Sequence, residues 1–312
     1  MVRNKLPLFT NVFVLLVLIY FYSMNPLFIQ AQFTIFASKS QNALKQEIIE
    51  RAKDYEEAPE NAYIDRVWKK TPGRNGIKVN IEKSYENMKK GGKFDELKLV
   101  FDEIPPDISL ADLPPSPIYR GHPEKEMVAL LINVSWGTEY IPNMLQTLNK
   151  HQVKATFFIE GKWANENKHI VEMIHEQNHL IGNHAYDHPD MAKISQEEMK
   201  RQIETTNNMI EAIVGYRTKW FAPPSGSYND DVVKIAHELG METILWTVDT
   251  IDWKNPSVSV MINRVMNNIH PGATILMHPT ESVSQGLDEL IDRIKHENYE
   301  LNTIENLLSE NR

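Results

Sequence analysis

Short apolar runs alternate with amphipathic segments from Met127 onward. Six runs are almost continuously apolar and are bounded by turn residues: "VALLINV", "ATFFIEG", "HLIGNH", "WFAPP", "METILWTVD" and "ATILMHP". Strands that are apolar along their whole length are typical of parallel sheets whose two faces are both covered. The pattern therefore predicts an α/β domain in which each run forms one strand.

The segments between these runs have helical spacing. "ISQEEMKRQIETTNNMIEAIV" begins with Ser195, has Glu198 three residues later as in a capping box, and carries its apolar side chains on one face: Met199, Ile203, Ile210 and Ile213. "NDDVVKIAHELG" ends at a glycine cap, and "GLDELIDRIKHE" is again helical. Six or seven such units favour a distorted, TIM-like (β/α) barrel of about seven strands over an open sheet, although the pattern alone does not separate the two.

The N-terminal segment, residues 1–38, has the pattern of a targeting sequence. After Arg3 and Lys5 no charged residue occurs until Lys39, and "LPLFTNVFVLLVLIYFY" is strongly apolar. A basic start followed by such a run is typical of a signal peptide or of a membrane anchor. Both alternatives place the rest of the chain outside the cytoplasm, in the cell envelope, either membrane-anchored or secreted.

Three segments separate this run from the barrel. Residues 39–56 are predicted to form a polar helical stalk, and residues 57–113 a small α+β module with a strand at "IKVNI", a helix at "EKSYENMKK" and a strand in "DELKLVFDEIPP". Five prolines within residues 104–121 predict a stiff linker, assigned to residues 114–125. The large domain then covers residues 126–308.

Charge and cysteine content narrow the possible partners and chemistry. The formal net charge is -9 and no basic run occurs, which argues against nucleic acid as a partner. The chain has no cysteine, so disulfides, thiolate catalysis and cysteine-ligated zinc are excluded. Any metal must be held by histidine and carboxylate side chains.

Polar side chains gather at the predicted strand ends, which form one face of a barrel and carry the reactive groups in such folds. They are Asn133, Ser135, Glu160, His184, His188, Ser225, Asp249, Asp252 and His278, and Pro223 belongs to the same strand end as Ser225. If a helix follows "HLIGN", His184 and His188 share one face and could hold one divalent metal. Taken singly, His278 is better explained as a packed core histidine, and the two aspartates fit turn caps.

Four motifs in this order, "HAYDH", "FAPPSG", "DTIDW" and "LMH", resemble the polysaccharide deacetylases of carbohydrate esterase family 4, the NodB homology domain. The resemblance covers about residues 126–305 and is strongest to the membrane-anchored, sporulation-associated subgroup of bacilli. It implies a distorted barrel that removes N- or O-acetyl groups from peptidoglycan, chitin-like glycan or xylan. It also implies a divalent metal, usually zinc, which activates water and the acetyl carbonyl.

The resemblance assigns roles to individual residues. It implies that His184 and His188 are metal ligands, that His278 is the general acid, and that Asp249 or Asp252 tunes His278. The remaining positions would form the substrate groove, with Leu276 lining the acetyl pocket, Trp253 forming a wall, and Pro223 and Pro224 shaping a loop. The implied partner is an N-acetylated cell-wall polysaccharide, either peptidoglycan or a chitin-like glycan.

The first motif of that family, T-F-D-D-G, is degenerate in this chain, where the aligned stretch is "NVSWG". Ser135 stands where the catalytic base is expected, Trp136 where the metal aspartate is expected, and Ala222 where an arginine steadies the base. A serine is a poor proton acceptor and an indole cannot ligate zinc. Replacement ligands within sequence reach are Asn133, Glu139, Asp187 and Asp190.

Three hypotheses for function therefore remain open. The first is a weak or unconventional deacetylase that hydrolyses a carbon-nitrogen amide bond other than a peptide. The second is a non-catalytic cell-wall glycan-binding protein in which Trp136, Trp220 and Trp253 either stack on sugars or pack in the core. The third is a purely structural role in an envelope complex. Residues 57–113 resemble a small peptidoglycan-binding module, with a family-specific stalk as the alternative.

Overall fold

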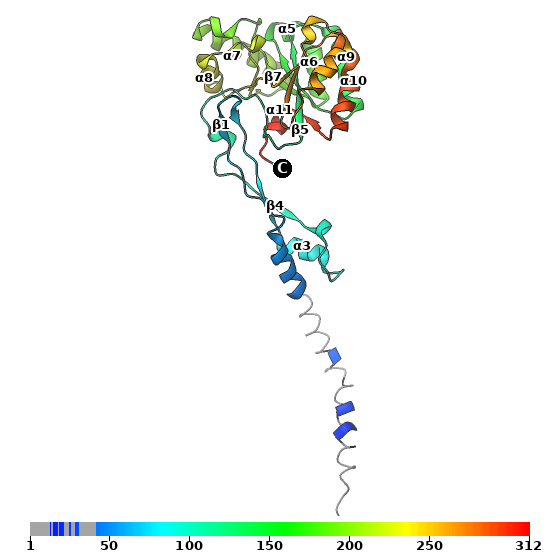
Figure 1. The fold of residues 1–312 in the computed structure, drawn as a ribbon. Helices are drawn as coiled ribbons and strands as arrows, with labels where there is room; N and C mark the ends of the chain where they lie inside the picture. The colour runs from blue at the N-terminus through cyan, green and yellow to red at the C-terminus, as the bar shows by residue number, and fades with distance from the viewer. Residues whose placement is uncertain (1–12, 14, 18, 22–24, 26–28, 31–41) are drawn as a thin grey trace, which may run out of the picture. The chain divides into compact units, whose positions relative to one another are not determined.

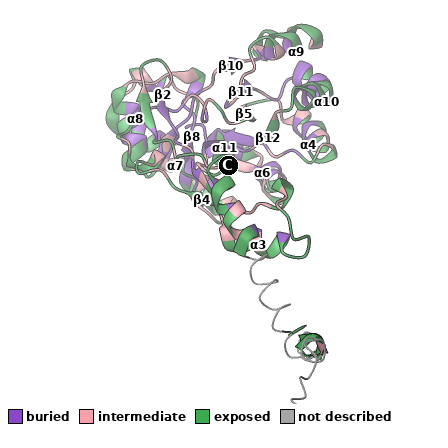
Figure 2. Ribbon diagram, turned by 60° about the horizontal axis from the view of Figure 1, so that its bottom comes forward, coloured by how far each residue is buried: buried purple, intermediate pink, exposed green. Residues whose placement is uncertain are grey.

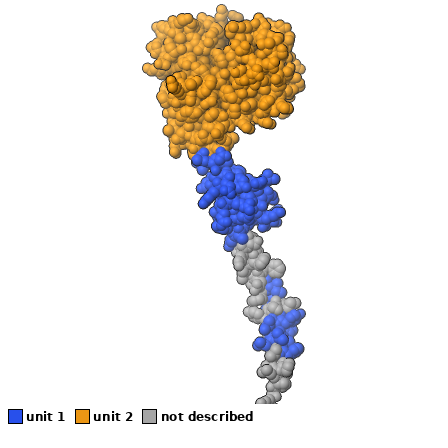
Figure 3. Space-filling model, in the orientation of Figure 1, with its two compact units in different colours: residues 1–58, 77–104 blue, residues 59–76, 105–312 orange. Residues whose placement is uncertain are grey.

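The computed structural model describes residues 13, 15–17, 19–21, 25, 29, 30 and 42–312 (Figure 1). The chain divides into two compact units, one of residues 1–58 and 77–104 and the other of residues 59–76 and 105–312 (Figure 3). Most of the predicted signal peptide or anchor lies outside the described residues. Among the residues that are described, no helix is both long and apolar enough to cross a membrane.

The first unit is built on a helix over residues 42–52. Its buried side chains Leu44, Ile48 and Ala52 recur every fourth residue, so they lie on one face, and they cluster with Val79 and Met88. The other elements are β3 (Gly76–Val79), α3 (Ile81–Met88), the 3-10 turn η1 (Glu96–Lys98) and β4 (Phe101–Ile104). The helix predicted at "EKSYENMKK" is therefore confirmed as α3.

The division between the units differs from the boundaries that the sequence suggested. Residues 57–113 were predicted as one module, but residues 59–76 and 105–113 group with the barrel, and residues 77–104 group with the helix at 42–52. The hairpin of β1 (Tyr63–Asp65) and β2 (Lys69–Thr71) thus belongs to the second unit. The resemblance of this segment to a peptidoglycan-binding module stays a prediction.

The second unit contains a curled, half-barrel parallel sheet with strand order β10-β11-β5-β6-β7-β8-β9, and β12 pairs beside β5. The parallel pairing is as predicted for a distorted (β/α) barrel of about seven strands: seven strands follow one another across the sheet, and β12 is an eighth. The strands are β5 (Met127–Val134), β6 (Thr156–Ile159), β7 (Leu180–Asn183), β8 (Trp220–Phe221), β9 (Glu242–Thr243), β10 (Val248–Asp249), β11 (Thr274–Met277) and β12 (Glu300–Asn302).

Helices cover the outside of the sheet, with α7 and α8 at one side and α9 and α10 at the other in Figure 1. They are α4 (Ile141–Lys150), α5 (Gly161–Glu166), α6 (Lys168–Glu176), α7 (Gln196–Val214), α8 (Asp230–Glu238), α9 (Val258–Met266), α10 (Glu281–His296) and α11 (Ile304–Leu308). The predicted helices are confirmed as α7, α8 and α10. Helix α10 begins earlier than expected because Thr280 caps it, its hydroxyl accepting from the Val283 amide at 3.4 Å.

Strand β5 shows which positions face the inside of the curl. Val128, Leu130, Ile132 and Val134 belong to the cluster that packs against the outer helices. The alternate residues Ala129 and Leu131 belong to a second cluster, inside the curl. Because side chains alternate along a strand, Asn133 and Ser135 continue the inner row towards the strand end. Figure 2 shows the buried residues gathered along the strands and the inner sides of the helices.

The run "METILWTVD" was predicted as one strand, and this prediction is wrong. The run forms β9 and β10, which lie at opposite ends of the sheet. Between them Ile244 pairs with Ile118, and the Thr247 amide donates to the Thr274 carbonyl at 3.2 Å. The chain therefore crosses the open side of the barrel. Ile118, a fully buried residue of the predicted linker, supplies the backbone partner that β9 would otherwise lack.

Lys70 on β2 is fully buried and forms an ion pair with Glu242 on β9, with Nζ 2.7 Å from Oε1. The Glu242 side chain is 23% exposed. The Lys70 amide also donates to the Pro117 carbonyl at 3.1 Å. The hairpin is thus attached to the barrel edge by one charged contact and by backbone hydrogen bonds.

His179, at the start of β7, is expected to make the fold acid-sensitive. Its Nδ1 accepts from the Ala155 amide at 3.2 Å, and burial lowers the pKa of His179 to about 4. A histidine in the unfolded chain titrates near its ordinary value, so the stabilisation is complete above about pH 6.5 and is lost as the pH falls towards 4. We expect a loss of about 2 kcal/mol at pH 5 from this group.

Urea unfolding at pH 7.5 and pH 5 measures this loss. The His179→Asn variant, which keeps an acceptor for the Ala155 amide, should lose less stability between the two pH values. An identical pH dependence in both proteins would contradict the assignment.

Candidate functional site

A cavity of about 360 Å³ opens at the carboxyl ends of the strands. Its lining residues come from the ends of five strands (β5, β7, β8, β10 and β11) and the loops that follow them, and from the crossing between β9 and β10. They are Asn133, Trp136, His184, His188, Ser225, Trp246, Asp249, Trp253, Leu276 and His278. The barrel thus brings together most of the predicted site residues, together with Trp246, which the sequence had not singled out.

The turn after β5 places Trp136 over His278. Gly137 has a φ of 74°, and a Cβ there would lie 1.9 Å from the Pro279 carbonyl oxygen, so only glycine fits. The Trp136 ring stacks on the His278 ring with centroids 5.0 Å apart and planes at 23°. Trp136 remains 44% exposed. An indole therefore covers one face of the predicted general acid.

Asp252 is the aspartate that contacts His278. The His278 ring Nδ1 donates to Asp252 Oδ1 at 2.8 Å, and its backbone amide donates to Oδ2 at 2.6 Å. Asp252 is fully buried. This pairing orients the ring and leaves Nε2 as the nitrogen available to a ligand. Asp249 instead lines the cavity, and its Oδ1 accepts from the Ile251 amide at 2.8 Å.

His184 is oriented in the manner of a metal-binding histidine. Its Nδ1 donates to the Ala222 carbonyl at 2.7 Å, which leaves the lone pair on Nε2. Complete burial, with His188 nearby, lowers the pKa of His184 to about 3, so the ring is neutral. The pKa of His188 is also lowered, by partial burial, and the two rings lie 5.2 Å apart.

The sequence suggested that a helix carries both histidines, but the structure shows a loop there. Residues 184–190 have no helical turn, and Ala185 and His188 both have a φ of 59°. Left-handed residues of this kind interrupt a helix, and the histidines meet through a folded loop instead. The prediction that His184 and His188 lie close together is confirmed, but the prediction that a helix brings them together is wrong.

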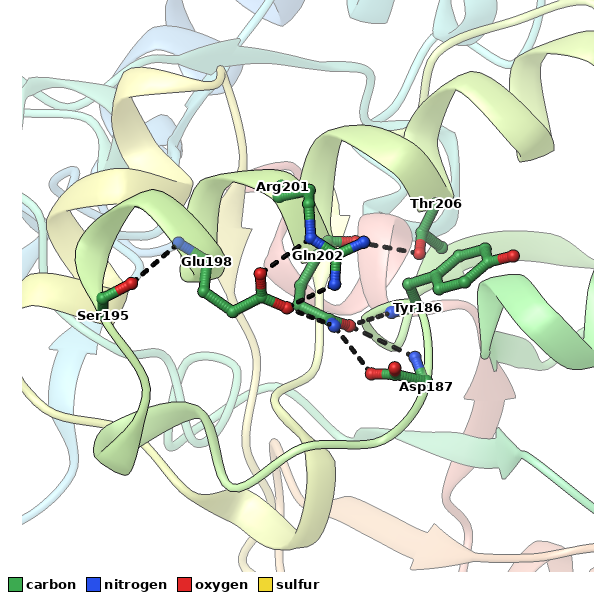
Figure 4. A network of polar contacts seen from close by, with 7 residues as sticks. All are labelled: Tyr186, Asp187, Ser195, Glu198, Arg201, Gln202 and Thr206. Atoms are coloured by element: carbon green, nitrogen blue, oxygen red, sulfur yellow. Dashed lines mark hydrogen bonds and ion pairs between the residues drawn. The ribbon is translucent and has the colours of Figure 1, made fainter.

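Gln202 on α7 contacts this loop through its side-chain amide (Figure 4). Its Oε1 accepts from the Tyr186 and Asp187 amides at 2.8 and 3.2 Å, and its Nε2 donates to Asp187 Oδ1 at 2.6 Å. Nε2 also donates to Glu198 Oε1 at 2.9 Å. The amide of one buried side chain thus holds the backbone midway between the two histidines.

The start of α5 holds the same loop from the other side. The Gly161 amide donates to the Ala185 carbonyl at 2.9 Å, and the Lys162 amide donates to the Tyr186 carbonyl at 2.7 Å. These amides have no partner within the helix, so the loop satisfies them. The loop is therefore clamped through both its carbonyl and its amide groups.

The Gln202→Leu variant is expected to lose about 2 kcal/mol of stability, because two partly buried loop amides are left without an acceptor. The ring signals of His184 and His188 should broaden or shift in NMR spectra, which a distant structural defect would not produce. Arg201→Ala removes an exposed partner of Glu198 on the same helix and serves as the control. Unchanged histidine signals in Gln202→Leu would contradict the clamp.

Glu160 is a buried carboxyl that the sequence noted only as a strand end. It follows β6, whose register places it beside Ser135 of the β5 edge and beside His184 after β7. Burial raises the pKa of Glu160, and the neighbouring Ser135 hydroxyl partly opposes this shift. Within the described residues, Ser135 Oγ and Asn133 Oδ1 are buried without a well-formed hydrogen bond. The inner rim therefore carries unpaired polar groups.

The donor set around His184 and His188 does not complete a zinc site of the catalytic kind, which needs three protein ligands. Among the described residues, the one group of three histidine or carboxylate ligands close enough to share an ion is His151, directly after α4, with Asp288 and Asp292 on α10. That group lies outside the cavity, and Lys150 already pairs with Asp288. The predicted metal stays a prediction.

Three of the four candidate replacement ligands do not line the cavity. Asp187 accepts from Gln202, and Asp190 contacts Lys193 and Ser227. Glu139 is exposed on the 3-10 turn Thr138–Tyr140. Of the proposed candidates, only Asn133 lines the cavity.

Some of the remaining residues predicted to form the groove are buried in the core, and the others line the cavity. Trp220 is buried in the inner cluster, which confirms the core-packing alternative for that residue. Trp253 is 51% exposed at the cavity, and Leu276 lies on its wall. Pro223 and Pro224 are buried beneath the loop, where Ser225 lines the cavity with a φ of 53°.

Comparison with known proteins identifies relatives of this arrangement. A family model for polysaccharide deacetylase matches residues 120–244. The crystal structure of BA3943, a CE4 family pseudoenzyme from Bacillus anthracis, is 54% identical, with 86% of this chain and 96% of that chain covered and a TM-score of 0.82. A BA3943 mutant with restored enzymatic activity is 52% identical over 86% of this chain and 99% of that chain, again with a TM-score of 0.82.

Two further relatives are known from sequence. The uncharacterized protein YlxY of Bacillus subtilis is 50% identical over 89% of this chain and 88% of its own length. The peptidoglycan-N-acetylglucosamine deacetylase of Bacillus cereus is 36% identical over 57% of this chain and 66% of its own length.

Proposed function

Because the chain belongs to carbohydrate esterase family 4, the polysaccharide deacetylases, we propose that it binds cell-wall glycan in the cavity without efficient deacetylation. The observation that carries this proposal is the stacking of Trp136 on His278 at the mouth of the cavity. An indole at the position predicted for the metal aspartate removes a ligand and adds a flat apolar surface. Sugar rings stack on such surfaces through their C–H faces.

The chemistry of the cavity supports binding over turnover. Ser135 replaces the predicted base, and loss of a general base lowers the rate by about 10²- to 10⁴-fold. His184 and His188 would hold a divalent metal, which in this family supplies an activated water, but two ligands hold it weakly. The His278–Asp252 pair could still deliver a proton to a leaving amine. However, this pair cannot activate the water that attacks the acetyl carbonyl.

A weak deacetylase that acts on the amide of an N-acetylated glycan is the second candidate. The intact His278–Asp252 pair favours it, since a cleft used only for binding does not require an oriented imidazole. A related pseudoenzyme from Bacillus anthracis has a mutant with restored enzymatic activity, which supports the view that such clefts lie a few side chains from catalysis.

The place of action is also a proposal. The apolar run before Lys39 supports a protein that is secreted or anchored in the membrane and acts outside the cytoplasm, and the resemblance to the membrane-anchored, sporulation-associated subgroup of bacilli supports the same place. The first unit would then contribute to contact with the wall. Relatives that deacetylate peptidoglycan support a cell-wall polysaccharide as the partner.

Calorimetric titration with partially de-N-acetylated chitotetraose, combined with an acetate-release assay, tests the proposal. We expect binding without acetate release, and a loss of affinity of about tenfold in Trp136→Ala. Lys219→Ala, at an exposed ion pair outside the cavity, is the control. Steady acetate release that depends on His278 would favour the weak deacetylase, and no binding at all would leave a structural role.

A further inference from the structure

We infer that the cavity selects hexosamine residues whose amino group is free, so that the preferred ligand is de-N-acetylated glycan. This inference rests on the proposed glycan-binding function and specifies the ligand of the same site. The discriminating group is the ammonium at C2 of the sugar. The residue that would recognise it is Asp249, with the surrounding indoles as secondary partners.

The charged groups that line the cavity favour a cation. Its ten lining residues comprise three indoles, three imidazoles, an amide, a hydroxyl, a leucine and one carboxylate, that of Asp249. None of them is a lysine or an arginine. The imidazole of His278 faces the buried carboxylate of Asp252. Asp249 therefore supplies the one carboxylate among the lining residues, with no lysine or arginine beside it in the lining.

Asp249 is positioned to accept a hydrogen bond from a ligand through its carboxylate. It pairs with Leu276 in the register of β10 and β11, so both side chains face the same wall. Its Oδ1 accepts from the Ile251 amide at 2.8 Å, which orients the group. No hydrogen bond within the described part of the chain engages Oδ2. A carboxylate held in this way forms strong, charge-assisted hydrogen bonds to an ammonium.

The indoles reinforce the same preference. Trp136, Trp246 and Trp253 all border the cavity, and the faces of indole rings attract cations. Trp253 already holds a cation on one face, since Lys254 Nζ lies 4.8 Å from its ring centroid. Trp246 packs against Gly226, where a Cβ would come within 2.9 Å of the indole. The Trp246 indole is thus held against the backbone of the loop after β8.

An acetamido group lacks these interactions. It is neutral, so it makes no charged pair with Asp249, and its carbonyl oxygen would be repelled by the carboxylate. Hydrogen bonds to charged groups contribute more than neutral ones, which corresponds to a preference of about tenfold or more for the free amine. The cavity would then recognise the product of an N-deacetylation rather than its substrate.

The test compares two tetrasaccharides that differ only in acetylation. The full-length protein is titrated with chitotetraose and with its fully de-N-acetylated form, and the Asp249→Asn variant, which keeps the shape and the acceptor for Ile251, is titrated alongside. We expect the de-N-acetylated form to bind about tenfold tighter to the wild type and the preference to vanish in the variant. Raising the salt concentration should weaken only the de-N-acetylated complex.

Two controls separate the cavity from the overall charge of -9. Glu139→Gln removes an exposed carboxylate outside the cavity and should leave the preference unchanged. Spermine, a polycation without sugar rings, should bind much more weakly than the de-N-acetylated tetrasaccharide, and equal binding would overturn the inference. Equal or tighter binding of chitotetraose would overturn it too while leaving glycan binding intact. Failure of both tetrasaccharides to bind would overturn the proposed function itself.

Discussion

The triple variant Ser135→Asp, Trp136→Asp and Ala222→Arg is expected to bind zinc and to release acetate from chitotetraose at least about a hundredfold faster than the wild type. One aspartate restores the base on the inner row of the β5 edge. The second replaces an indole with an oxygen ligand that completes the set of His184 and His188. The arginine extends from the end of β8, next to the carbonyl that orients His184, and can pair with the new base.

Glu160 should affect the pH dependence of acetate release by the triple variant. An aspartate at position 135 would lie beside a carboxyl whose pKa is already raised by burial, and two adjacent carboxylates disfavour a second ionisation. Adding Glu160→Gln to the triple variant should therefore lower the pH at which acetate release reaches half of its maximum. An unchanged pH profile would mean that the two groups do not interact.

The matched control adds His184→Ala to the triple variant, which should abolish both zinc binding and the gained activity. A gain that survived this change would exclude the assigned metal site. A triple variant with neither zinc nor acetate release would mean that "NVSWG" does not occupy the position of the first family motif. The readouts are metal content after dialysis and acetate release, so binding and chemistry are measured separately.

The Lys70→Ala variant is expected to lose about 3 kcal/mol of unfolding free energy, since removal of one partner of a buried ion pair leaves an uncompensated charge. The remaining charge is on Glu242, whose partial exposure limits the penalty. Because Lys70 joins β2 to β9, we also expect the β1–β2 hairpin to exchange its amide protons faster than the strands of the barrel. Urea unfolding and hydrogen exchange measure the two effects.

Two comparisons isolate the charge. Lys70→Met with Glu242→Gln removes both charges while filling the space, and should be more stable than Lys70→Ala alone. Lys219→Ala breaks an exposed pair with Glu305 and should change stability by less than about 1 kcal/mol. If Lys70→Ala were no more destabilising than Lys219→Ala, the buried pair would contribute nothing to attachment of the hairpin.

The sequence alone determined the parallel sheet covered by helices, because continuous apolar runs and amphipathic helices are local patterns that such layering buries. It favoured a barrel over an open sheet, and the tertiary structure decided how the sheet curls. The sequence also placed His184, His188, Asp249, Asp252 and His278 at one face, since parallel strands end on the same side. The loss of carboxylates at Ser135 and Trp136 could be stated from the residues themselves. These inferences depend on residue identity and spacing, which the chain carries in full.

The tertiary structure decided which side chains meet. Asp252 and not Asp249 pairs with His278, and Glu160 neighbours Ser135 through strand register. Trp246 reaches the cavity because "METILWTVD" breaks and crosses the open barrel. Gln202 clamps the histidine loop from a helix fifteen or more residues away. Contacts of this kind depend on register, left-handed turns and pairing between distant segments. The free energies that stabilise these contacts come from the whole fold, so no short stretch of the sequence predicts them.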